Sequence, residues 1–207
     1  MKFPRSFSPL QVGPYWLDHR VVMAPLTRMR ADKESFAPHP LNADYYRQRA
    51  TKGGLIIAEA SPVLATGRGG VANGSGGTDP MPLYSHVIHS LDSLRLAYLH
   101  FIEPRSSGAG RAEVNHQNVP SAMVLFRPMW NGVLIAAGGF TGETAEAAIA
   151  ADHADAIAFG RIFISNPDLP QRLRQGFPLA PYNRATFYGG GEAGYTDYPV
   201  HKAIRQP

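Results

Sequence analysis

Short continuous runs of apolar residues recur along the chain, each bounded by glycine, proline or polar residues. They are residues 21–26, 55–60, 96–102, 133–137 and 156–159. Runs this short, without alternation of polar and apolar positions, predict strands that are buried on both faces of a sheet.

Segments with helical spacing lie between these runs. Residues 41–51 and the alanine-rich residues 143–151 are predicted helices. A third helix would place four apolar residues on one face, namely Leu83, Val87, Leu91 and Leu94. Alternating strands and helices indicate parallel βαβ units.

The number of strands does not complete a barrel. Five are visible in 207 residues, whereas a closed (β/α) barrel needs eight and typically about 250 residues. The irregular place is residues 67–79, where six of thirteen residues are glycine and neither periodicity is present. We interpret it as a linker, because it lacks the GxxxxGK[ST] pattern and the helix directly behind it that a phosphate-binding loop requires.

Composition narrows the class of protein to a globular, enzyme-like single domain. The chain is 44% hydrophobic and 17% charged, and its net charge of +4 comes from scattered basic residues, so nucleic-acid binding is not expected. With no cysteine, disulfides, thiolate nucleophiles and cysteine metal sites are excluded. The first ten residues lack a signal-like apolar stretch, and no run of eighteen apolar residues occurs; we expect a cytoplasmic protein without a membrane span.

The sharpest local chemistry follows the last two predicted strands. Gly138 and Gly139 follow residues 133–137, and Thr141 can cap the next helix, so backbone N–H groups and a helix dipole would face an anion. Gly160 and Arg161 follow the next strand, and a guanidinium can grip phosphate through two parallel hydrogen bonds. The alternative is that the glycines are packing turns and that Arg161 pairs with a carboxylate. Two such motifs on consecutive βα units favour a phosphate site, as in many (β/α) barrels.

Several longer strings, taken in order, resemble the Old Yellow Enzyme family of FMN-dependent NAD(P)H oxidoreductases. The strings are VVMAPLTR (21–28), YYRQRA (45–50), LIIAEA (55–60), LAYLH (96–100), FGRIFISNPDL (159–169), TFYGGG (186–191) and GYTDYP (194–199). The resemblance implies a (β/α)8 TIM-barrel type of fold in one domain, residues 1–207. It further implies that strands one, two, six, seven and eight are present, and that strands three, four and five are missing at the glycine-rich junction 67–79.

The resemblance also implies site residues. Pro25, Leu26 and Thr27 would line the flavin ring, with the Thr27 hydroxyl donating near the pyrimidine carbonyl, and Ala60 would offer a backbone contact. Tyr188 would form a wall where substrate stacks, although it could instead be an aromatic residue that packs its loop.

The phosphate of FMN would be held by the residues already singled out, Gly138, Gly139, Gly160 and Arg161. The family's paired His-x-x-His or His-x-x-Asn belongs to the fourth strand and has no match here, so no catalytic residue is assigned. His86 and His89 share that spacing but fall inside a predicted helix, where we expect surface or packing roles.

The function that follows is NAD(P)H-dependent reduction, through FMN, of alkenes conjugated to carbonyl or nitro groups. A second hypothesis is a catalytically inactive relic that binds FMN or phosphate, or acts only as an interaction domain. A phosphate-binding barrel lyase or isomerase is a third, but it would not explain Thr27 or Tyr188. Unpaired strand edges would promote self-association.

Overall fold

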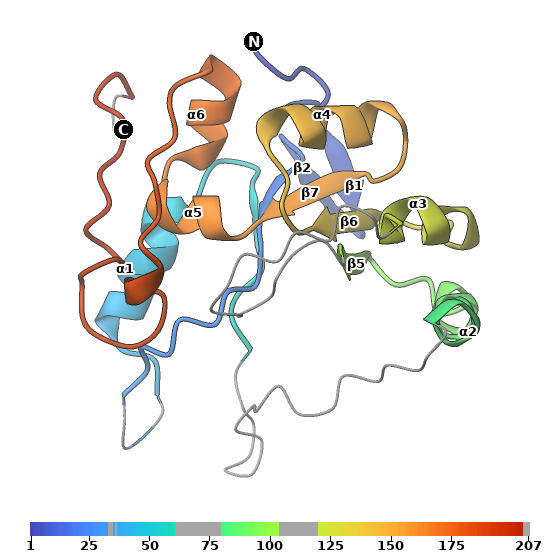
Figure 1. Cartoon of the computed structure of the whole chain (residues 1–207), viewed down its shortest axis with the longest axis horizontal. Coiled ribbons are helices and arrows are strands. Elements are labelled where there is room, and N and C mark those ends of the chain that lie inside the picture. Colours follow the sequence, from blue (N-terminus) through green and yellow to red (C-terminus); the bar gives the residue numbers. More distant parts are fainter. Residues whose placement is uncertain (33–34, 36, 61–79, 104–119, 205–207) are drawn as a thin grey trace.

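The computed structural model describes residues 1–32, 35, 37–60, 80–103 and 120–204 (Figure 1). The predicted junction at residues 67–79 lies outside this part of the chain. No helix in the described ranges is both long and apolar enough to span a membrane.

Five parallel strands form the central sheet of the described chain. They are β3 (Val21–Met23), β4 (Leu55–Ile56), β5 (Leu99–Ile102), β6 (Leu134–Ala137) and β7 (Ala156–Phe159). Their order is β4-β3-β7-β6-β5, and every pairing is parallel. The prediction of an α/β fold with a parallel sheet is therefore confirmed. β3 stops short of the predicted 21–26 because Pro25 has no N–H to donate to the ladder.

Alternating residues of these strands face two different layers. Met23, Ile157 and Phe159 belong to a core shared with the helices, whereas Val22 and Ala158 belong to a core on the other face. The helices are α1 (Pro40–Arg49), α2 (Pro80–Asp92), α3 (Ala122–Phe126), α4 (Gly142–Ala150), α5 (Arg161–Ser165) and α6 (Leu169–Gln175), with 3-10 turns at Arg127–Met129 and Arg184–Thr186 (Figure 1). The two-residue period of a strand places the helices on one face of the sheet.

The other face is covered by a hairpin that the apolar runs did not predict. β1 (Leu10–Val12) and β2 (Tyr15–Leu17) are antiparallel, and Gly13 turns between them with a φ of 56°. Asp18 N–H donates to the Gly53 carbonyl at 2.9 Å, so the hairpin lies at the amino ends of the strands. The sequence signal for this hairpin was the pair Gly13-Pro14 between the short segments LQV and YWL. This signal is weaker than the longer apolar runs elsewhere in the chain.

The predicted apolar face of α2 is correct only at Leu91. The helix ends at Asp92, so Leu94 lies beyond it, and Leu83 and Val87 are 37% and 38% exposed. Ile88, only 2% exposed, enters the core, and Leu91 of the predicted face packs against it. Spacing alone could not choose between two apolar stripes on the same helix.

Candidate functional site

Two glycine-containing loops emerge side by side from β6 and β7. The strands are neighbours, with Ala137 opposite Ala158, so Gly138 and Gly139 leave the sheet at the same carboxyl edge as Gly160 and Arg161. The sequence predicted this placement. Whether the loops bind phosphate stays a prediction.

The loop after β6 has an open backbone. Gly138 and Gly139 have φ angles of 110° and 70°, which residues other than glycine rarely adopt. A Cβ on Gly139 would meet no atom of the described residues within 4 Å, so this part of the chain leaves the space over it open. Such a turn can present N–H groups to an anion.

Helix α4 begins directly behind this loop with a capped end. The Thr141 hydroxyl accepts a hydrogen bond from Thr144 N–H at 3.3 Å, and the Thr144 hydroxyl oxygen accepts one from Thr141 N–H at 2.8 Å. The sequence prediction of Thr141 as the N-cap is confirmed. The positive end of the α4 dipole therefore lies next to the open glycine loop.

The loop after β7 contacts the loop after β3. A Cβ on Gly160 would lie 3.2 Å from Leu26 Cδ2, and Ala24 N–H donates to the Phe159 carbonyl at 3.1 Å. Arg161 is half-buried at the start of α5, and its guanidinium carbon lies 5.9 Å from the centre of the Tyr182 ring. One residue expected to line the flavin ring thus touches one expected to hold the phosphate.

The remaining predicted ring-side residues gather around Arg28. Pro25, Thr27 and Ala60 are exposed and Leu26 is half-buried. Arg28 N–H donates to Glu59 Oε2 at 2.9 Å, which brings the residue before Ala60 to the residue after Thr27. Tyr188 is 43% exposed.

The sequence reasoning missed the buried arginines, three of which are at most 3% exposed. Arg28, Arg30 and Arg49 are 1%, 3% and 1% exposed, and burial lowers the pKa of Arg49 to about 10. The Arg49 guanidinium carbon lies 3.7 Å from the centre of the Tyr45 ring, which stacks on Tyr195. Arginine is rarely buried, and no periodic pattern marks these positions. Arg28 and Arg49 lie within the quoted motif strings, which was the available signal, whereas Arg30 lies outside them.

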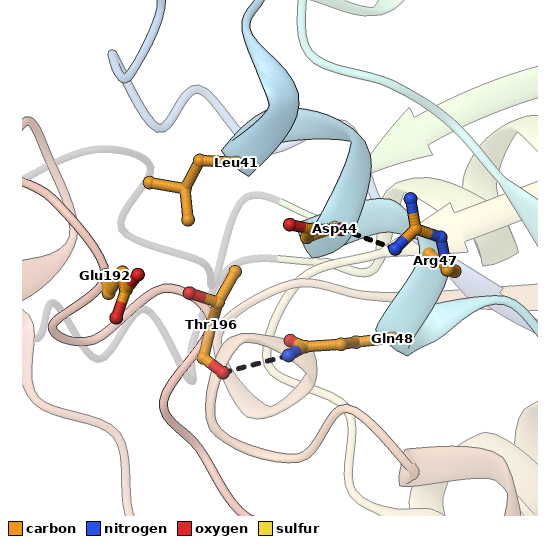
Figure 2. Close-up of a pocket in the computed structure, with 6 residues that line it drawn as sticks. All are labelled: Leu41, Asp44, Arg47, Gln48, Glu192 and Thr196. Atoms are coloured by element: carbon orange, nitrogen blue, oxygen red, sulfur yellow. Dashed lines mark hydrogen bonds and ion pairs between the residues drawn. The ribbon is translucent and has the colours of Figure 1, made fainter.

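A cavity of about 370 Å³ lies away from these loops, between α1 and the C-terminal segment (Figure 2). It is lined by Leu41, Asp44, Arg47, Gln48, Glu192 and Thr196. A second cavity of about 380 Å³ lies beside it, around Tyr198. Neither cavity includes a predicted site residue.

The two histidines with the family's spacing do not reach this edge. His86 and His89 are exposed on α2, as expected for surface positions.

Comparison with known proteins identifies the family. The model of the NADH:flavin oxidoreductase / NADH oxidase family matches residues 6–78 and 77–180. The chain is 42% identical to 12-oxophytodienoate reductase 2 of Arabidopsis thaliana over 127 residues, which are 60% of this chain and 33% of that protein. It therefore spans about a third of the length of this and similar curated reductases.

A fungal relative aligns along nearly its whole length. Flavin oxidoreductase hxnT of Emericella nidulans is 25% identical over 375 residues, covering 93% of this chain and 97% of the relative.

Solved structures give the same fold. Morphinone reductase matches with a TM-score of 0.77 at 23% identity, covering 96% of each chain. The old yellow enzyme from Trypanosoma cruzi matches with a TM-score of 0.79 at 19% identity, covering 97% of this chain and 100% of that one. These neighbours imply a fold of the (β/α)8-barrel type. Since the family model covers most of the sequence, the chain belongs to the NADH:flavin oxidoreductase / NADH oxidase family, as its resemblance to the Old Yellow Enzyme family predicted.

Proposed function

We propose that this chain is a shortened FMN-dependent NAD(P)H oxidoreductase of the ene-reductase type, acting in the cytoplasm and lacking barrel strands three, four and five. The convergence of the β6 and β7 loops at one sheet edge carries the cofactor assignment.

Three observations support the missing segment. The family model matches in two stretches that meet at residues 77–78, within the glycine-rich junction. The alignment with hxnT runs over 375 positions, although this chain has 207 residues. The order β4-β3-β7-β6-β5 equals barrel order two-one-eight-seven-six, with the first and last strands paired.

The residues present fit the phosphate end of FMN better than its ring. The free space at Gly139, the capped start of α4 and the Arg161 guanidinium suit a doubly charged anion. On the ring side, Thr27 and Ala60 contribute one border. When bound, FMN would supply hydride transfer from NAD(P)H to an alkene conjugated to a carbonyl or nitro group.

A catalytically inactive relic that binds FMN or phosphate, or serves as an interaction domain, is the second candidate. It is favoured by the absence of a match to the family's fourth-strand catalytic pair. Colour and turnover of the purified chain distinguish the two. An enzyme is yellow, is bleached by NADPH and regains its colour with cyclohexenone; a yellow but unreactive protein is the relic. A colourless chain that FMN cannot reconstitute refutes the cofactor assignment for both.

A further inference from the structure

Arg28 is hydrogen-bonded to both residues that flank Tyr188. Its Nε donates to the Phe187 carbonyl at 2.8 Å, and its own carbonyl accepts from Gly189 N–H at 2.9 Å. Its N–H donates to Glu59. Thr27, Ala60 and Tyr188, all predicted to lie beside the flavin, are therefore each next in sequence to Arg28 or to a residue hydrogen-bonded to it.

The C-terminal segment closes around Arg28 and Arg30 as a cage of carbonyl groups. Their guanidinium groups donate at 2.7–3.3 Å to five backbone oxygens, those of Thr186, Phe187, Gly191, Ala193 and Gly194. The backbone can turn these oxygens inward because Gly189, Gly190 and Gly194 have φ angles of 67°, 82° and 67°.

The charge and the donor geometry of arginine both bear on which side chain this cage of carbonyl groups can hold. Burial, and secondly the Arg28 charge, lower the pKa of Arg30, so the two cations oppose each other. Replacing buried charged groups by apolar residues of similar volume is often neutral or stabilising, so charge alone does not explain arginine at these positions. A planar fork of five donors can satisfy several carbonyls at fixed angles, which the point charge of lysine cannot.

We propose that Arg28, supported by Arg30, is a positioning residue that fixes Tyr188 against Thr27 and Ala60. It thereby makes one wall from three separate strands and loops. The positioning stands on geometry alone; only the use of that wall for substrate rests on the proposed function.

Amide hydrogen exchange of the full chain tests the positioning without cofactor. In Arg28→Lys, exchange across residues 186–194 should rise at least about tenfold, while residues 133–159 change less than about twofold. Gly194→Ala, a change in the C-terminal segment itself, should raise exchange across residues 186–194 in the same way, because the added Cβ would clash with the Thr186 side chain. The matched control is Arg20→Met, which removes donors to the Pro9 and Asp155 carbonyls near the amino ends of the strands and should leave residues 186–194 unchanged.

Unaltered exchange in residues 186–194 of Arg28→Lys overturns the proposal, as does an equal rise in residues 133–159. If neither variant folds, the unmodified chain decides: an unprotected Gly189 amide refutes the contact, whereas a protected one supports it.

A second measurement reports on the wall itself. If the chain reduces cyclohexenone, Arg28→Lys should raise KM several-fold in the native chain and add nothing in a Tyr188→Ala background, since both would act on the same wall. Additive effects would mean that Arg28 does not act through Tyr188. Failure of the protein to bind FMN would refute the proposed function and leave the exchange result valid.

Discussion

Gly139 and Gly176 share a backbone conformation but differ in their surroundings. Their φ angles are 70° and 74°. Gly139 lies at the carboxyl edge with free space over its Cβ position, whereas Gly176 ends α6 beside the Lys2 side chain. Alanine substitutions at these two glycines therefore separate the effect of backbone strain on stability from the effect of a blocking methyl group on anion binding.

We predict that Gly139→Ala and Gly176→Ala each lower the free energy of unfolding by about 1 kcal/mol through strain. Only Gly139→Ala should weaken FMN binding, by about tenfold, because its methyl group occupies the approach to the loop N–H groups. Denaturant unfolding and flavin titration measure the two effects. Equal FMN affinity in both variants would remove Gly139 from the phosphate site.

His100 on β5 gives the fold an acid-sensitive position. Burial lowers its pKa from 6.5, and its Nε2 has no hydrogen-bond partner within the described residues. Between the lowered folded pKa and 6.5 the unfolded chain binds more protons, so stability is full above 6.5 and is lost as the pH falls through that window.

We therefore predict that His100→Leu flattens the fall in unfolding free energy as the pH drops below 6.5, measured with urea at each pH. His19, also buried with a lowered pKa, should retain part of the slope. An unchanged slope in the variant would contradict the assignment to His100.

At this scale the sequence predicted residues whose chemistry is local. Thr141 follows from a capping pattern, and the glycines of 138–139 follow from their position after a strand. Arg28 could not be predicted in this way, because its partners at 186–194 lie more than 150 residues along the chain.

At the scale of elements, α4 connects the candidate site to the N-terminus. Glu146 accepts hydrogen bonds from Arg5 N–H, Ser6 N–H and Ser6 Oγ, each at 2.8 Å. Glu143, one turn earlier, forms an exposed ion pair with Lys2.

We predict that Glu146→Ala lowers the free energy of unfolding by about 2 kcal/mol, since two backbone donors lose their acceptor. Glu143→Ala on the same helix should cause no measurable change, because exposed ion pairs contribute little. Thermal unfolding compares the two. Similar destabilisation by both would show that Glu146 does not anchor the N-terminal segment.

The apolar runs predicted all five sheet strands, because strands buried on both faces need unbroken apolar sequence. The hairpin β1–β2 escaped since its strands are exposed at Gln11, Tyr15 and Trp16, so they are not buried on both faces. Only Leu91 of the predicted face of α2 packs against the core, because the position of a helix depends on neighbours that sequence spacing does not specify.

At the scale of the whole molecule, the sheet has β4 and β5 at its edges, each with one neighbour in the described chain. Ile102 on β5 is 64% exposed. Strand edges of this kind recruit further strands, and a second copy of the chain is the partner we propose.

We predict concentration-dependent self-association in sedimentation velocity, reduced by Ile102→Lys, which places a charge on the edge. Val124→Lys, a substitution of a 45% exposed residue on α3, is the control for added charge. A strictly monomeric native chain at high concentration would refute this proposal.

The α/β class and the parallel sheet could be predicted from the alternation of apolar runs and helical segments and from the family resemblance. The arrangement of the strands at the two edges of the described sheet could not, because no local pattern specifies which strand each edge would pair with.

The central claim is that the loops after β6 and β7 together hold the phosphate of FMN. Parallel titrations with FMN and with riboflavin, which lacks the phosphate, test it in the native chain and in Arg161→Met. The account predicts that the native chain binds FMN about a hundredfold more tightly than riboflavin and that Arg161→Met removes most of this difference. Equal affinity for the two flavins in the native chain, or no binding of either, would contradict it.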